Sequence, residues 1–397
     1  MLPTMQSAKT SVVAQAIEKR DDGLFIYDMG EPVVGVVAFD VSLPAPGALS
    51  VHYGEVLPEL RSSQAPETPW FRQPRDRWKG KAGVQTLTGD GRRAFRYFSV
   101  QWPDARAGHV ERVSIVSKPH FVEERGYFRC SDPLLNKIWT ISSRTTRLCM
   151  RAYYEDGVKR DGLLWLGDCR VQYLCNTGVF GDTELMKTSL RMVAASQNED
   201  GSVPACAAKG GGHRHPEAGY TAADRIDYMP TIPRFPSQWL LQNYMWDYVS
   251  SVREYVLFSG DLDTGHELCD SLCRVLRWLA KHGNPLEARP GHDYFTDNGF
   301  QEDGHIFARP RALRAQGLAA CRDAEQLADW LGRPELACWA VAAKNTLRPT
   351  LPSEGKRPCW HSVFLERLAG IGSRDEWIRA SDNPNALRPR SAYMWYW

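Results

Sequence analysis

Short β-branched and aromatic segments dominate the chain up to about residue 122. They are bounded by Gly, Pro or Asp, and no helical stretch separates them. Many short strands without intervening helices are typical of an antiparallel β-sandwich. Residues 61–77, rich in proline and charge, are expected to form an exposed loop. The pattern predicts strands over 25–28, 33–39, 48–53, 95–102 and 113–116.

After about residue 125 the apolar positions recur at helical spacing. A start signal, Ser131-Asp132, stands before the first such segment at Pro133. Helix pairs joined by short turns favour a helical bundle or toroid. We therefore expect a β-sandwich over 1–124 and a helical domain over 125–397. Helices are predicted over 168–179, 183–196, 236–259, 262–282, 308–331, 334–348, 359–370 and 373–381, with a final start near 391.

Composition and charge narrow the class of protein. Of the 397 residues, 43% are hydrophobic and 24% charged, which is typical of a soluble globular protein. A net charge of +2 gives no global field that would attract nucleic acid or an anionic membrane. The first residues contain no apolar run of signal-peptide length, and no segment is apolar over ~18 residues. We predict a cytoplasmic protein that binds neither nucleic acid nor membrane.

The cysteines and histidines point away from a metal site. Ten cysteines are scattered without C-x-x-C pairs, which favours reduced, packed thiols. Cys269 and Cys273 share one face of a predicted helix, where they could either bind a metal ion as a pair or pack in the core. His213 and His215 stand in the Gly- and Pro-rich stretch 197–234, as ligands or as exposed side chains. We expect no metal and no cofactor, and we expect 197–234 to be a loop that lines a site.

A dense acidic segment between two predicted helices carries the chemistry. Asp156, Asp161 and Asp168 stand here together with Arg160 and Trp165. Cleavage of a glycosidic bond needs a carboxylic acid that protonates the leaving oxygen, and a sugar site adds carboxylates for hydroxyl groups and an aromatic wall. The alternative is structural: Asp168 caps the following helix, Asp156 closes a turn, and Arg160 forms a surface ion pair.

The spacing of these residues resembles the signature of the bacterial α-L-rhamnosidases, glycoside hydrolase family 78. That signature is an Asp, then an Arg, an acidic residue and Trp-x-Gly-Asp, and it stands here as Asp156, Arg160, Asp161, Trp165 and Gly167-Asp168. The resemblance extends outward, to residues 127–139, 197–204 and 246–261 and to the strands around 27–30 and 95–98.

The resemblance implies an (α/α)6 six-hairpin toroid behind the sandwich and hydrolysis of terminal α-L-rhamnosides with inversion. Asp161 matches the general-acid position, where many members have Glu. Asp156, Arg160, Trp165 and Asp168 match positions that bind rhamnose. A general acid must hold its proton near neutral pH, so we expect burial and the two neighbouring carboxylates to raise the pKa of Asp161.

The second carboxylate that inversion requires has no counterpart in the sequence. The family's base is a Glu beyond an aromatic helix, and residues 391–397 resemble that helix. We therefore expect the last toroid helices and the base to be missing, which fits a fragment or a chain completed by another subunit, including a homo-oligomer. Candidate replacements among the remaining carboxylates are Glu199, Asp200, Glu302, Asp303, Glu354 and Glu366, although Asp200 also suits an Asp-Gly turn.

Three functions remain open from the sequence. The first is an inverting rhamnosidase, and the second is a relic that binds carbohydrate without cleaving it. The third is a helical scaffold that binds protein through the aromatic residues 391–397. The sequence does not select an aglycone or a linkage.

Overall fold

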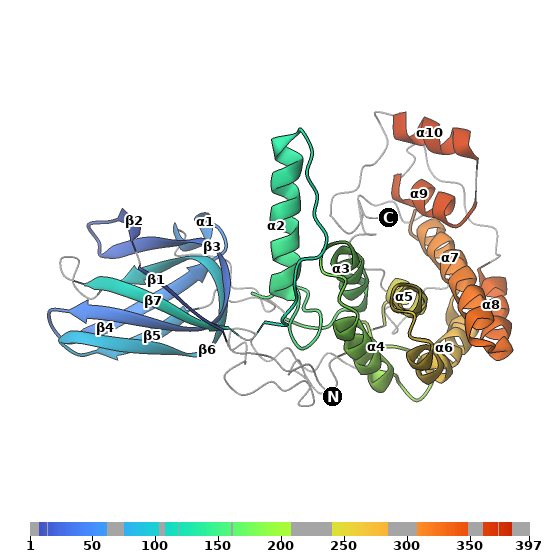
Figure 1. The fold of residues 1–397 in the computed structure, drawn as a ribbon, viewed down its shortest axis with the longest axis horizontal. Coiled ribbons are helices and arrows are strands. Elements are labelled where there is room, and N and C mark those ends of the chain that lie inside the picture. Colours follow the sequence, from blue (N-terminus) through green and yellow to red (C-terminus); the bar gives the residue numbers. More distant parts are fainter. Residues whose placement is uncertain are drawn as a thin grey trace. The chain divides into compact units, whose positions relative to one another are not determined.

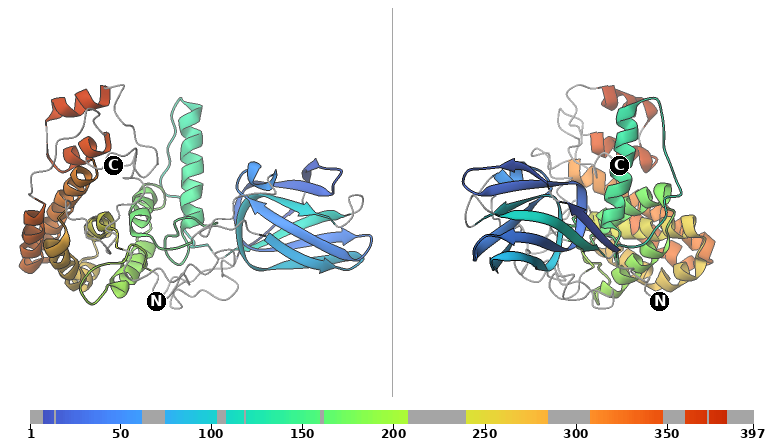
Figure 2. Two further views of the ribbon diagram at one scale, coloured as in Figure 1. Left: turned by 180° about the vertical axis from the view of Figure 1, so that it is seen from behind. Right: turned by 60° about the vertical axis from the view of Figure 1, so that its left-hand side comes forward.

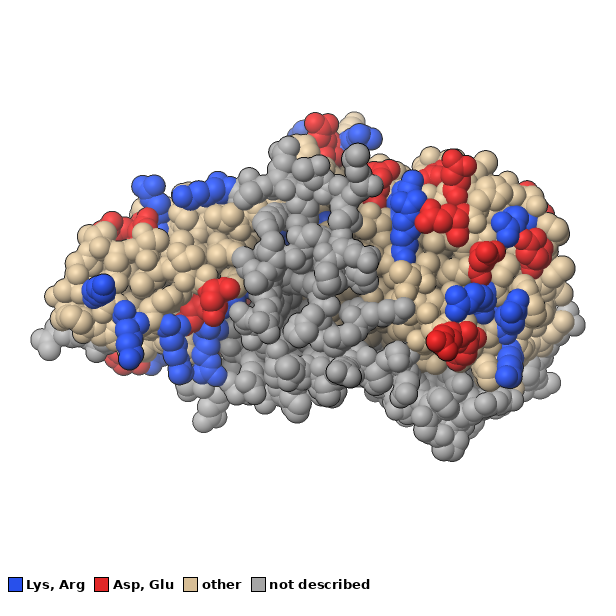
Figure 3. Space-filling view, turned by 90° about the horizontal axis from the view of Figure 1, so that it is seen from below, with Lys and Arg blue, Asp and Glu red and all other residues tan. Residues whose placement is uncertain are grey.

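The computed structural model describes residues 8–13, 15–61, 75–102, 108–117, 119–159, 162–207, 240–284, 308–347, 360–371 and 373–382 (Figure 1). Two compact units divide the chain between Leu163 and Leu164. The first unit holds the strands, two helices and the chain up to Leu163. The second holds the remaining helices. On the face seen in Figure 3, side chains of both charge signs are interspersed over the described surface.

The strands of the first unit form one antiparallel sheet. Its order is β1-β7-β3-β6-β4-β5, and β2 pairs with the beginning of β3. The predicted antiparallel β domain before a helical region is confirmed. The strands are β1 (Ala8–Val13), β2 (Ala16–Lys19), β3 (Leu24–Leu43), β4 (Gly47–Gly54), β5 (Arg75–Gly80), β6 (Gly83–Gln101) and β7 (His109–Ser117).

This sheet is rolled around its own apolar core. Phe39 on β3 packs against Trp78 on β5 with ring centroids 6.0 Å apart, although β6 and β4 lie between these strands in the sheet. The long strands β3 and β6 shift register between Asp28 and Val33, where a bulge allows them to bend. Alternate side chains therefore point to one interior, where Tyr53, Phe95 and Phe98 meet.

Strand β5 corrects the C-terminal end of the loop predicted over 61–77, of which residues 62–74 lie outside the described residues. Residues 75–77 belong to β5, and Arg61 ends the short helix α1 (Pro58–Arg61). An inward-facing position of β5 carries a charged side chain, Asp76, which is buried. Asp76 accepts a hydrogen bond from the Tyr53 hydroxyl (2.6 Å) and forms an ion pair with Arg93. An alternation rule that looks for apolar side chains misses such a strand.

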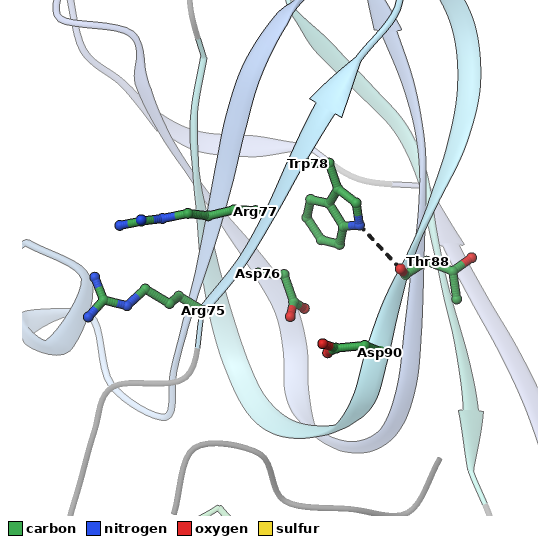
Figure 4. A pocket seen from close by; sticks show the side chains of 6 residues that line it. All are labelled: Arg75, Asp76, Arg77, Trp78, Thr88 and Asp90. Carbon is green, nitrogen blue, oxygen red and sulfur yellow. Dashed lines mark hydrogen bonds between the residues drawn. The ribbon is translucent and has the colours of Figure 1, made fainter. Parts of the chain in front are cut away.

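A pocket of about 350 Å³ opens beside β5, and Figure 4 shows the side chains that line it. Several of its polar groups have partners in the sheet. Asp76 is held as described, Arg93 also pairs with Asp90 (2.9 Å), and the Trp78 indole donates to the Thr88 carbonyl (3.2 Å). We assign this pocket a structural role.

Helix α2 (Pro133–Cys149) follows the sheet in the same unit and begins where the sequence predicts. The Asp132 carboxylate accepts a hydrogen bond from the Leu134 amide (2.8 Å), and Pro133 occupies the first turn.

The second unit stacks its helices in two layers (Figures 1 and 2). One layer runs through α3, α5, α7 and α9, each packed on the next, and the other runs through α4, α6 and α8. Helix α5 is buried on nearly all sides, so it lies at the centre of this unit. The helices are α3 (Leu166–Val179), α4 (Glu184–Ser196), α5 (Gln242–Ser259), α6 (Leu262–His282), α7 (Ala308–Leu331), α8 (Pro334–Thr346), α9 (Trp360–Leu368) and α10 (Arg374–Asp382).

Each of these helices falls within a few residues of a predicted range. The helix predicted over 236–259 begins at Gln242, and residues 236–239 lie outside the described residues. The start expected near 391 and the completeness of the toroid lie outside them too. None of the helices that the structure describes is long and apolar enough to cross a membrane.

We expect Asp261→Ala to destabilise the helical unit by about 1–2 kcal/mol, because this side chain caps α6. It accepts hydrogen bonds from the Thr264 amide (2.9 Å) and the Tyr255 hydroxyl (2.7 Å) and pairs with Lys187 (2.8 Å). Partial burial raises the pKa of Asp261, but these bonds outweigh it and hold the pKa well below the ordinary 3.8.

A carboxyl group whose pKa is lower in the folded chain than in the unfolded chain stabilises the fold at every pH above its unfolded pKa. This stabilisation is lost as the pH falls from the unfolded pKa through the folded pKa. The difference in unfolding free energy between wild type and Asp261→Ala, measured in urea, should therefore be widest at neutral pH and narrow below about pH 4. A difference that stays constant down to pH 2 would contradict this.

Candidate active site

The acidic segment 155–168 crosses the boundary between the two units. Residues up to Leu163 belong to the first unit, and Trp165 and Asp168 belong to the second. Arg160 and Asp161, the predicted sugar-binding arginine and general acid, lie outside the described residues. The residues on either side of them are described.

Asp156 closes the loop that contains these two positions. Its backbone amide donates to the Leu163 carbonyl (3.0 Å), and its carboxylate accepts from the Leu163 amide (3.0 Å). Gly162 adopts a φ of 59° and donates to the Gly157 carbonyl (3.0 Å). The turn-closing role considered for Asp156 is therefore present. The side chain is only half-buried.

Buried contacts within the first unit hold this loop. Glu155, completely buried, forms a two-pronged ion pair with Arg92 on β6 (2.9 and 2.8 Å). Lys159, also buried, pairs with Glu59 on α1 (2.6 Å). The Tyr153 hydroxyl donates to the Gly162 carbonyl (3.0 Å). The β domain thus holds the residues before positions 160 and 161, and Tyr153 of the same unit holds Gly162 after them.

Trp165 and Asp168 take their positions from the second unit. Leu166 donates to the Ala205 carbonyl (3.1 Å) and Ala207 to the Leu164 carbonyl (3.0 Å), so residues 164–166 pair briefly with 205–207. Helix α3 then begins at Leu166. Asp168 lies in its first turn, while Trp165 stands at the N-cap position without a side-chain capping bond. The alternative in which Asp168 caps this helix is wrong, because the helix begins at Leu166 with Trp165 at the cap position.

Tyr244 on α5 contacts both of these side chains and was not predicted. Its hydroxyl donates to the Asp168 carboxylate (3.3 Å), and its ring meets Trp165 edge to face at 6.4 Å. Helix periodicity places Tyr244 in a buried helix, but no local signal connects it to a residue 76 positions earlier. Trp246, two residues on, is completely buried and belongs to the core.

Two of the carboxylates considered as replacement bases have structural partners. Asp200 accepts hydrogen bonds from Ser202 (2.9 and 2.6 Å) and from the Trp278 indole (3.2 Å). Partial burial opposes these bonds, yet they lower the pKa of Asp200. Glu366 forms a two-pronged ion pair with Arg311 (3.0 and 2.5 Å). Glu199 is exposed, and Glu302, Asp303 and Glu354 lie outside the described residues.

Among the residues that the structure describes, the thiols and histidines form no further candidate site. Cys269 and Cys273 are buried on α6. In the described ranges, no three His, Cys, Asp or Glu side chains gather so that they could hold a metal ion. His213, His215 and residues 391–397 lie outside these ranges.

The comparisons with known proteins agree with the motif. Residues 123–285 match the family model of the bacterial α-L-rhamnosidase six-hairpin glycosidase domain. No match is found among curated protein sequences.

Among solved structures, a rhamnosidase from Klebsiella oxytoca with rhamnose bound superimposes with a TM-score of 0.77 at 20% identity, over 98% of this chain and 82% of that one. The family 78 rhamnosidase of Bacillus sp. GL1 superimposes with a TM-score of 0.72 at 20% identity, over 96% of this chain and 40% of that one. The Streptomyces avermitilis α-L-rhamnosidase complexed with L-rhamnose superimposes with a TM-score of 0.64 at 19% identity, over 94% of this chain and 34% of that one. The chain thus spans well under half the length of the last two.

At these identities the superpositions show the fold alone. Residues 123–285 match the bacterial α-L-rhamnosidase six-hairpin glycosidase domain, and the resemblance of this chain to glycoside hydrolase family 78 is confirmed.

Proposed function

We propose that the protein hydrolyses terminal α-L-rhamnosides with inversion of configuration. The observation that carries the proposal is the complete motif Asp156, Arg160, Asp161, Trp165 and Asp168 within the matched domain. Rhamnose is bound in the Klebsiella and Streptomyces structures, which supports a rhamnosyl group as the substrate.

In this proposal Asp161 donates a proton to the glycosidic oxygen as the bond to the anomeric carbon breaks. A second carboxylate removes a proton from a water molecule, which attacks the same carbon from the opposite face. The two carboxyl groups of inverting enzymes stand roughly 6.5–9.5 Å apart, which leaves room for that water. The structural bonds of Asp200 and Glu366 favour neither as this base.

The other motif residues bind the sugar. Asp168 and Asp156 accept hydrogen bonds from hydroxyl groups, Arg160 donates to ring substituents, and Trp165 packs against the apolar face of the deoxy-sugar. Trp165 and Asp168 are each partly exposed, which supports a role in contact with a ligand. The bonds that hold Glu155, Asp156 and Leu163 on either side support the role given to position 161, because a proton donor must be held in place.

Turnover of an aryl α-L-rhamnoside tests the proposal, and the anomer first released, followed by NMR, tests inversion. Asp168→Ala should weaken L-rhamnose binding at least 10-fold, because a hydrogen bond to a charged group contributes about 1.5–3 kcal/mol. Asp270→Ala, at an exposed carboxylate, is the matched control. Rhamnose binding that depends on Asp168 without any turnover would favour the carbohydrate-binding relic. Absence of both would reject the proposal.

A further inference from the structure

Tyr244 stands against the motif on a helix that lies far from it in the sequence. We propose that Tyr244 is a positioning residue, which holds the Asp168 carboxylate and the Trp165 ring in the orientation that receives the sugar. The inference rests on the proposed function, because it assigns Asp168 and Trp165 to sugar binding.

The first observation is a pair of contacts from one buried side chain. Tyr244 is 3% exposed, and its hydroxyl reaches the Asp168 carboxylate at 3.3 Å. Its ring meets the Trp165 ring at an interplanar angle of 78°. Aromatic pairs prefer this edge-to-face arrangement, which restricts the orientation of both rings. One residue on α5 therefore restrains two motif side chains.

The second observation explains the glycine between them. A Cβ atom on Gly167 would lie 2.2 Å from Cε1 and 2.7 Å from Cζ of Tyr244, closer than atoms can approach. The ring thus occupies the space that any other residue at position 167 would need. The Trp-x-Gly-Asp segment therefore packs directly against the Tyr244 ring. Gly167 is required for this close contact and not for an unusual backbone angle.

The third observation fixes α5 against α3. Arg170, two residues after Asp168, donates to Asp247 (2.8 Å) and forms a two-pronged pair with Glu254 (2.9 and 2.7 Å). Burial opposes the charged form, but the two carboxylates raise the pKa of Arg170, so it stays ionised. Asp247 and Glu254 lie on the same side of α5 as Tyr244, three and ten residues further on. This largely buried triad sets the register that brings Tyr244 to Asp168.

The test separates the hydroxyl group from the ring. Tyr244→Phe removes the hydrogen bond and keeps the ring, and should weaken L-rhamnose binding about 3- to 10-fold, the worth of one hydrogen bond. Gly167→Ala should displace the ring and weaken binding more. Tyr248→Phe is the matched control, because the Tyr248 hydroxyl, on the same helix, bonds to Ser271 (3.0 Å) and not to Asp168.

Two double-mutant cycles decide whether Tyr244 acts through Asp168. In the Asp168→Ala background, Tyr244→Phe should change rhamnose affinity no further, measured by calorimetry. In urea unfolding, Tyr244→Phe and Asp168→Ala should couple by about 3- to 10-fold in the unfolding constant, and Tyr248→Phe should not couple with Asp168→Ala.

The unfolding cycle distinguishes the two ways of failing. Coupling in a protein that does not bind rhamnose would reject the proposed function and keep the contact between Tyr244 and Asp168. No coupling, wild-type affinity in Tyr244→Phe, or an equal loss of affinity in the Asp168→Ala background would overturn the positioning role.

Discussion

Asp161→Asn is expected to lower kcat/KM for an alkyl α-L-rhamnoside by about 10²–10⁴-fold, the usual contribution of a general acid. Asparagine has nearly the same shape but has no acidic proton to give to the leaving oxygen. The loss should be much smaller for a 2,4-dinitrophenyl rhamnoside, since that leaving group departs without protonation. Initial rates on the two substrates measure the difference.

The pH profile gives an independent reading of the same variant. The wild-type rate should fall at high pH as the general acid ionises, and this limb should disappear in Asp161→Asn. Asp270→Asn, at an exposed carboxylate, should retain both the rate and the profile. Equal losses on the two substrates, or an unchanged high-pH limb, would remove Asp161 from the role of acid.

Glu155→Gln should lower the free energy of unfolding of the first unit by about 3–5 kcal/mol, because it leaves the Arg92 guanidinium buried with no counter-charge. Both side chains are nearly inaccessible to solvent, at 5% and 0% exposed. Urea unfolding followed by tryptophan fluorescence measures the loss. Rhamnoside turnover should fall with it, since Glu155 anchors the loop that carries position 161.

An exposed pair of the same chemistry supplies the control. Arg191 and Glu267 also form a two-pronged pair, but each side chain is nearly half exposed, so Glu267→Gln should cost less than about 1 kcal/mol. The double variant Arg92→Met with Glu155→Leu should recover part of the stability that Glu155→Gln loses. Similar costs for Glu155→Gln and Glu267→Gln would mean that water reaches the Arg92 pair.

The sequence predicts the helical part of this fold closely because periodicity and capping are local signals. Asp132 and Pro133 start α2 as expected, and Gly260-Asp261 separates α5 from α6. Strand β5 was missed because its inward position carries Asp76, whose charge is balanced by Arg93, a partner on another strand.

The spacing of the motif residues identified the motif, but the sequence did not predict the distant residues that hold them in place. The pair between Arg92 and Glu155 spans 63 positions, and the bond between Tyr244 and Asp168 spans 76. Such partners meet only after the chain has folded, so no window of sequence contains both. Whether Asp168 caps α3 could be decided only by knowing that the helix begins at Leu166.

The guanidinium that neutralises Glu155 comes from the sheet of the same unit, so the start of the motif segment depends on one named position of the β domain. A β domain that replaced this one, by evolution or by engineering, would have to supply a cation where Arg92 stands. Divergence of the β domain is therefore constrained at that position by the segment that carries the chemistry.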